Sequence, residues 1–172
     1  MRKFYIALIF MCLTGTAIWL YCRDTGADFD STGVADLPER DAEVIEAVLR
    51  SESSHPTDRI YFLTNTPMGE WFEHKRWNRL PNEFHRKISD LTPAYLPADG
   101  AYINRRGSVF QRGTNREAWM QWIFIRRWIS DTEVEISNGV WRCSLGGGGH
   151  SAVYRKIDGH WQFERSLGNW VS

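Results

Sequence analysis

The chain contains only three cysteines in 172 residues, and two of them, Cys12 and Cys22, lie in its apolar N-terminal stretch. Cys143 stands alone in the rest of the chain, which excludes an intrachain disulfide scaffold there and a metal site built on paired cysteines. No internal repeat of fixed period and no Gly-x-Ser-x-Gly elbow of serine hydrolases occurs. Because Cys143 alternates with Trp141 and Leu145, we expect it to be a buried structural thiol.

The N-terminal stretch has no charge between residues 4 and 22, a run of 19 residues that follows Arg2 and Lys3. At about 1.5 Å per residue, such a helix just spans a hydrocarbon core of about 30 Å. Residues 1–22 therefore predict a single-pass signal anchor with its N-terminus in the cytoplasm and the domain outside, periplasmic or extracellular. Two alternatives remain: cleavage after the small residues 15–17, which would release a secreted protein, and lipoprotein processing at Cys22.

The part after the anchor divides into a short polar segment and one domain. Residues 23–36 mix Asp, Gly, Ser and Thr and predict a flexible linker, and residues 37–172 have the usual size of a single domain. The net charge of zero conceals an acidic segment, 24–46, and a basic one, 71–130. This asymmetry fits an acidic or anionic partner, whereas export argues against nucleic acid.

Hydrophobic periodicity predicts helices first and strands later. Apolar residues at helical spacing indicate helices over 38–51 and 81–91, with a shorter one over 70–79. The β-branched and aromatic run 59–64 predicts a strand, and residues 91–100, with two prolines and a glycine, predict a loop.

The last third predicts consecutive strands. Residues 118–129 are apolar on both faces up to Ile125, as in a strand covered on both sides. Tight turns are expected at Asn138-Gly139, at Gly146–Gly149 and at Asp158-Gly159. The predicted fold is therefore α+β, an antiparallel meander of four to five strands with two or three helices on one face, preceded by the transmembrane helix.

The closing segment resembles known folds. Residues 154–163, with an Asp-Gly turn followed by Trp161, resemble the final hairpin of cystatin-like and NTF2-like domains. The span from Ala42 onward is similar to small uncharacterised bacterial exported α+β proteins, through Trp128-Ile-Ser-Asp-Thr132 and Gly159-His-Trp161. The second resemblance implies a fold and no established activity.

Several residues are candidates for chemistry. Gly146–Gly149 before His150-Ser151 lacks the lysine of a phosphate-binding loop and precedes a strand, so we interpret it as a flexible turn. His150 and His160, facing each other across the last hairpin with Glu164, would form a metal or acid–base site. Cys143 beside His150 would form a nucleophile–base pair.

Basic residues beside aromatic ones form a further candidate, a surface for anionic lipid or an acidic protein. Its members are Arg126, Arg127, Trp122 and Trp128, together with Arg105, Arg106 and Arg112 on an expected loop.

None of these patterns is specific enough to assign a catalytic, cofactor-binding or metal residue. We expect a membrane-anchored envelope protein whose domain is a non-enzymatic binding or accessory module for a protein partner or a small ligand, without a cofactor. The alternative is a small enzyme with a pocket between the helices and the sheet.

Overall fold

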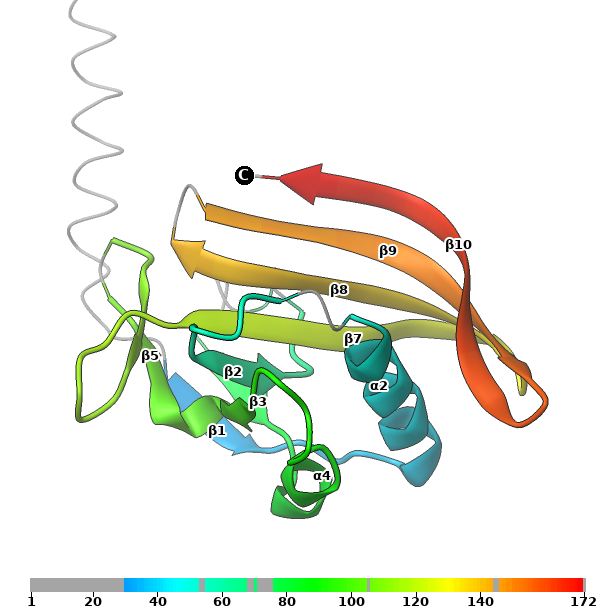
Figure 1. Cartoon of the computed structure of the whole chain (residues 1–172), viewed down its shortest axis with the longest axis horizontal. Coiled ribbons are helices and arrows are strands. Elements are labelled where there is room, and N and C mark those ends of the chain that lie inside the picture. Colours follow the sequence, from blue (N-terminus) through cyan, green and yellow to red (C-terminus); the bar gives the residue numbers. More distant parts are fainter. Residues whose placement is uncertain are drawn as a thin grey trace, which may run out of the picture.

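The computed structural model describes residues 30–52, 55–67, 70, 76–104, 106–143 and 146–171. Long strands form the last third of the chain, and the short elements come first (Figure 1). The elements are, in chain order, β1 (Asp30–Val34), α2 (Glu39–Ser51), β2 (Tyr61–Thr64), β3 (Arg76–Arg79), α4 (Asn82–Lys87), β4 (Tyr95–Pro97), the 3₁₀ helix η1 (Ala98–Gly100), β5 (Ala101–Ile103), β6 (Val109–Gln111), β7 (Trp119–Ser130), β8 (Glu133–Cys143), β9 (Gly146–Ile157) and β10 (His160–Val171).

One large mixed sheet dominates the fold. It has eight strands in the order β1-β3-β2-β7-β8-β9-β10, with β4 also paired to β2. β7 to β10 form the expected antiparallel meander, but β2 joins β7 in parallel, and β1 joins β3 in parallel. The predicted four- to five-stranded antiparallel sheet is therefore wrong in size and in type. The extra strands pair with segments distant in sequence, which local periodicity does not reveal.

Helix α2 covers one face of this sheet. Its residues Val44, Ile45, Val48 and Leu49 are buried against the sheet, as their spacing predicts. The expected helix over 38–51 is confirmed, and the one over 81–91 is present as the shorter α4. Of the segment expected to form a third helix, residues 76–79 form the strand β3.

The other face is covered too, by the short 3₁₀ helix η1 and the β5–β6 hairpin rather than by α-helices. A second core forms there around Trp77, Met120 and Trp122, with Phe62 from β2. The prediction of a sheet covered on one face only is therefore wrong. The two-sided burial of the first half of β7, which its apolar run predicted, is confirmed.

Gly139, Gly147 and Gly149 in the meander serve packing rather than turning. Asn138-Gly139 lies inside β8, and Gly146–Gly149 begins β9, so both predicted turns are wrong; the Asp158-Gly159 turn is confirmed. A Cβ on Gly147 would lie 2.6 Å from Trp141, and one on Gly149 would lie 2.9 Å from Trp122. The absence of side chains at these glycines leaves room for the indole rings. The Trp122 ring also stacks on that of Trp170 of β10, with ring centroids 5.7 Å apart.

The N-terminal predictions fall largely outside the described residues. These comprise the anchor at 1–22 and linker residues 23–29. Residues 30–34, expected to be linker, form β1 and pair with β3. Among the residues that the structure describes, no helix is both long and apolar enough to cross a membrane.

Candidate functional site

A polar group interrupts the apolar contact between α2 and the sheet at the end of the helix. Glu52 is the residue that ends α2, and its backbone N–H bonds to the carbonyl of Val48. Its side chain contacts polar side chains from two strands and a loop, and a further polar side chain from a third strand joins them through Asn138. We call this group the Glu52 cluster; it consists of Glu52, His55, Gln121, Asn138 and His150.

The cluster is built on a chain of carboxamides. Gln121 of β7 donates its Nε2–H to Asn138 Oδ1 on β8, and Asn138 donates its Nδ2–H to Glu52 Oε1. Gln121 is fully buried, and Asn138 is only 2% exposed. Buried polar groups are costly unless they are hydrogen-bonded, so breaking these two hydrogen bonds would be unfavourable. The two carboxamides therefore hold the Glu52 carboxylate in one orientation.

Two histidines flank the Glu52 carboxylate. His55 Nε2 lies 3.7 Å from Oε2, and His150 Nε2, on β9, lies 3.6 Å from Oε1. The His55 ring stacks on Tyr61 with ring centroids 5.1 Å apart. Both distances are longer than the N···O distance of a direct hydrogen bond. A small rotation of either side chain would bring the imidazole nitrogen into hydrogen-bonding distance of the carboxylate.

Tyrosines surround the cluster and make its environment less polar. Burial raises the pKa of Tyr61, and burial together with the charge of Glu52 raises the pKa of Tyr95 and of Tyr154. These phenols therefore stay neutral near pH 7, and the carboxylate is the only formal negative charge within the cluster.

One strong acceptor of the cluster is unused. The buried Gln121 Oε1 has no hydrogen-bond partner, although nearly all such atoms have one. Gln121 is joined to the Glu52 carboxylate through Asn138, so the unused acceptor and the carboxylate belong to one hydrogen-bonded group. Within the described part of the chain, no set of three His, Cys, Asp or Glu side chains has the geometry of a metal site.

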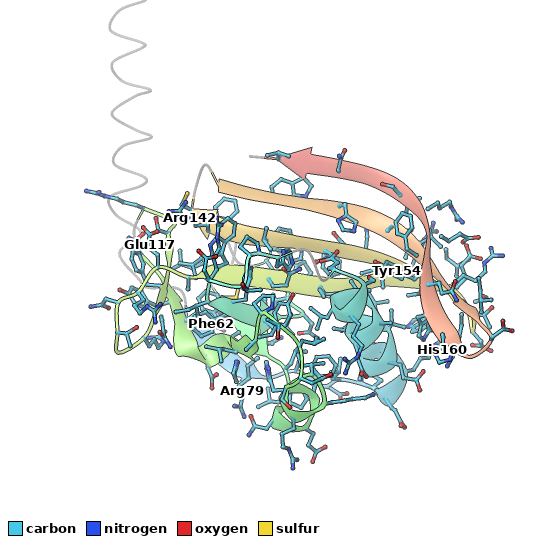
Figure 2. The ribbon with its side chains drawn as sticks, in the orientation of Figure 1. Phe62, Arg79, Glu117, Arg142, Tyr154 and His160 are labelled. Carbon is cyan, nitrogen blue, oxygen red and sulfur yellow. The ribbon has the colours of Figure 1, made fainter. Side chains whose placement is uncertain are left out.

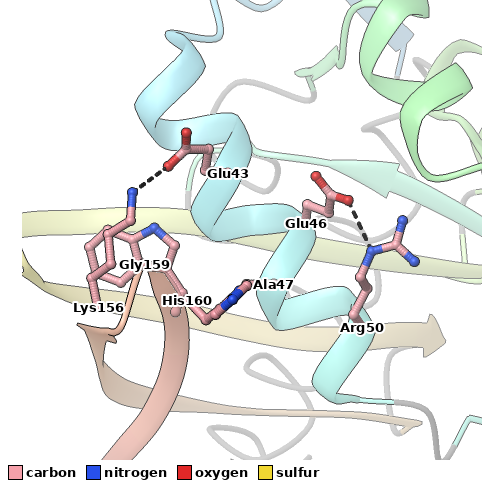
Figure 3. Close-up of a pocket in the computed structure, with 8 residues that line it drawn as sticks. Glu43, Glu46, Ala47, Arg50, Lys156, Gly159 and His160 are labelled. Atoms are coloured by element: carbon pink, nitrogen blue, oxygen red, sulfur yellow. Dashed lines mark hydrogen bonds and ion pairs between the residues drawn. The ribbon is translucent and has the colours of Figure 1, made fainter.

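A nearby pocket of about 280 Å³ has a different character (Figure 3). It lies between α2 and the β9–β10 hairpin, and its charges pair with one another: Lys156 contacts Glu43 at 2.9 Å, and Arg50 contacts Glu46 at 2.9 Å. The hydrogen bond from Lys156 lowers the pKa of Glu43. Since these charges already neutralise each other, we interpret the pocket as a brace between the helix and the hairpin.

The structure separates the histidines that the sequence placed together. His150 pairs with Asn169 across β9 and β10, whereas His160 lies at the opposite end of the hairpin, beside its turn (Figure 2). Along β9, seven residues separate His150 from Ile157, the partner of His160, which is about 23 Å at 3.3 Å per residue. Glu164 instead pairs with Arg155 at 2.8 Å. The predicted His150–His160–Glu164 site therefore does not form.

The other candidate sites are also dispersed. Cys143 is half-buried rather than buried, and it lies opposite Gly146, whereas His150 lies opposite Asn138. A nucleophile–base pair between Cys143 and His150 is thus not present. The run Gly146–Gly149 is strand and offers no phosphate-binding loop.

The predicted basic aromatic surface does not assemble. Trp122 is buried in the core, and Trp128 is covered by Arg40 at 3.3 Å from the ring centroid. Arg126 and Arg127 both bind Glu135, at 2.6 and 2.8 Å. Of the expected loop arginines, Arg112 donates to the carbonyl of Ala101, Arg106 lies in an exposed turn, and Arg105 lies outside the described residues.

Sequence reasoning missed four of the five members of the Glu52 cluster. One signal was available: Gln121 is a polar residue within an otherwise apolar strand, flanked by Met120 and Trp122. Asn138 was interpreted as a turn residue, which hid its role. Glu52 and His55 carry no local pattern, because their partners lie far along the chain.

Comparison of this chain with protein-family models, with curated proteins and with solved structures finds no match in any of the three.

Proposed function

We propose that this domain binds a small polar ligand that donates hydrogen bonds, and that the Glu52 cluster is its binding site. The observation that carries this proposal is the buried Gln121 Oε1, an acceptor without a partner that is linked through Asn138 to an oriented carboxylate. A donor group of a ligand would satisfy that acceptor and would interact with the carboxylate of Glu52. Tyr61 and Tyr95 supply the apolar walls that small-molecule sites usually have.

Three side chains of the cluster are partly exposed. Glu52 and His55 keep 18% and 19% of their side-chain surface exposed, and His150 keeps 34%. Because Gln121 and Asn138 are buried more deeply, we propose that a ligand enters past the histidines and meets the carboxylate before the carboxamides. Amines, amides and hydroxyl compounds have the required donors.

Acid–base chemistry is a second candidate, favoured by one specific arrangement. Asn138 orients Glu52 through Oε1, while Oε2 faces His55 at 3.7 Å. A base held by an orienting group next to a second titratable side chain is the arrangement of general acid–base sites. Turnover of a bound compound that Glu52→Gln abolishes would support this candidate; binding without turnover would support the first.

Side-chain amide NMR tests the binding proposal. Methylamine, acetamide and glycerol are titrated while the NH₂ signals of Gln121 and Asn138 are followed. We expect a saturable shift with at least one compound. Glu52→Gln keeps an acceptor but removes the charge, so it should weaken methylamine binding by about tenfold or more and leave acetamide binding nearly unchanged.

Glu39→Gln is the matched control, because Glu39 is exposed at the other end of α2. It should bind every compound as the parent chain does. If none of the three compounds moves either carboxamide signal, the proposal is wrong.

Location at a membrane is part of the same proposal. We propose that residues 1–22 anchor the chain and hold the domain outside the cytoplasm, close to the membrane surface. The uncharged run behind Arg2 and Lys3 supports this view.

A further inference from the structure

A second polar site lies where the loop before β2, the turn before β7 and the end of β8 meet. It is a cleft of about 220 Å³. In Figure 2 two of its residues, Glu117 and Arg142, lie together at the end of the sheet away from His160. The lining residues are Asp58, Arg59, Ile60, Arg116, Glu117, Trp119 and Arg142.

The cleft carries an excess of positive charge. Three arginines and two carboxylates line it, which leaves a net charge of +1. Arg142 pairs with Glu117 at 2.8 Å, and Arg59 pairs with Asp58 at 3.9 Å. For Arg116, the described residues provide no ion-pair partner.

Both carboxylates lie at the outer rim. The Glu117 side chain is 61% exposed and that of Asp58 is 85% exposed. Ion pairs exposed to this degree contribute only about 0 to 1 kcal/mol. An entering anion can therefore take over the guanidinium groups at little cost.

Trp119 forms the apolar wall of the cleft and orders its arginines. The Arg59 guanidinium lies 4.5 Å from the centroid of the indole ring, and that of Arg142 lies 5.9 Å from it. The ring contacts that of Tyr61, and the backbone N–H of Trp119 donates a hydrogen bond to the carbonyl oxygen of Ile60, which holds the residue in place. Cation–π contacts of this kind keep flexible arginine side chains near one position.

We propose that this cleft binds a small oxyanion, a carboxylate or a phosphate group, on Arg59, Arg116 and Arg142. Guanidinium groups match both anions because their planar donors reach two oxygens at once. Trp119 and Ile60 favour an anion that carries an apolar or aromatic part. This site is separate from the Glu52 cluster, and it does not depend on the function proposed for that cluster.

NMR titration of the full chain with inorganic phosphate and, separately, with benzoate tests the proposal. The indole N–H signal of Trp119, assigned with Trp119→Phe, reports on binding. We expect saturable binding of at least one anion, weakened by added sodium chloride. Tighter binding of phosphate would identify a phosphate ligand, and tighter binding of benzoate would identify an aromatic carboxylate.

Two variants should act in opposite directions. Arg116→Gln should weaken binding by about tenfold, because one charged donor is lost. Glu117→Gln should strengthen binding by roughly threefold, because it removes a competing carboxylate. A merely structural role of these residues would not predict an increase.

Arg86→Gln is the matched control, since the Arg86 side chain is 78% exposed on α4 and pairs only with Glu83 among the described residues. It should bind as the parent chain does. The proposal is overturned if neither anion binds saturably, if Arg86→Gln weakens binding as much as Arg116→Gln, or if Glu117→Gln reduces affinity.

Discussion

The carboxylate of Glu52, at the end of α2, accepts a hydrogen bond from the carboxamide of Asn138, in the middle of β8. The two residues are 86 positions apart in sequence, and only the packing of the helix on the sheet brings them together. This contact joins the helix to the meander through polar atoms, within a surface otherwise held by Leu49, Ile136 and similar side chains.

A carboxylate at position 138, next to that of Glu52, should make the protein less stable at neutral pH. Asn138→Asp would place two carboxylates in contact and remove the donor, for a loss of about 2 to 4 kcal/mol at pH 7. The folded state of the variant would hold a shared proton more tightly than the unfolded state, so its stability should rise as pH falls from 7 to 5. Urea unfolding at both values measures this. Asn169→Asp, on the exposed edge strand β10, should show no such rise.

An added methyl group at Gly149 should disturb the indole packing. A Cβ there would lie 2.6 Å from the Asn138 carbonyl oxygen and 2.9 Å from Trp122, so Gly149→Ala should cost about 1 to 3 kcal/mol. Gly33→Ala meets no atom within 4 Å and should be neutral or slightly stabilising. Denaturant unfolding of both variants tests the comparison; equal stability would contradict the packing role of Gly149.

His85 should make stability depend on pH below its ordinary pKa. Burial lowers its pKa, despite the hydrogen bond to the Tyr95 carbonyl and the charge of Asp99, and Arg79 lowers it further. Stability is therefore complete above the unfolded value of 6.5 and is lost as pH falls through the folded pKa.

The measurement is the melting temperature between pH 7.5 and 5.5. His85→Gln should remove part of the decrease in this range. The loss below about pH 4.5, where the lowered pKa values of Glu43 and Glu46 matter, should remain. An unchanged profile in the variant would show that His85 does not contribute.

The Glu135 ion-pair group should respond non-additively to mutation. A bulge between Ile125 and Arg127 lets the consecutive residues Arg126 and Arg127 reach one carboxylate, whose side chain is only 7% exposed. Arg126→Met or Arg127→Met alone leaves one partner and should cost under about 1 kcal/mol.

The double variant leaves the buried carboxylate unpaired and should cost about 3 to 5 kcal/mol. Equilibrium unfolding of the four proteins completes the double-mutant cycle. A double effect equal to the sum of the single effects would mean that the two arginines act independently.

The N-terminal segment should carry the chain to membranes. Leu8→Lys with Leu13→Lys places two charges in the apolar run, each costing about 2.5 to 3.5 kcal/mol at the centre of a helix in a bilayer. The variant should move from the membrane fraction to the soluble fraction. Thr25→Lys, outside the run, should stay with the membrane, and identical fractionation of all the proteins would refute the anchor.

Local patterns predicted part of the fold well. The apolar stripe of α2, the two-sided burial of β7 and the Asp158-Gly159 turn were all visible, because each depends on residues close together in the chain. The pair Asn138-Gly139 suits a tight turn but lies inside a strand. Asn138 contacts Glu52, and Gly139 leaves space for the Trp122 ring.

The sequence by itself determined the amphipathic helix α2, the consecutive strands of the last third, and that only one cysteine lies beyond the apolar N-terminal run. Tertiary structure alone decided that β2 lies parallel to β7, that His150 and His160 are far apart, and that Glu52 meets Gln121, Asn138 and two histidines. The reason is physical. Periodicity records which face of an element avoids water, whereas partners of polar groups depend on how distant elements pack, and no short stretch of sequence encodes that arrangement.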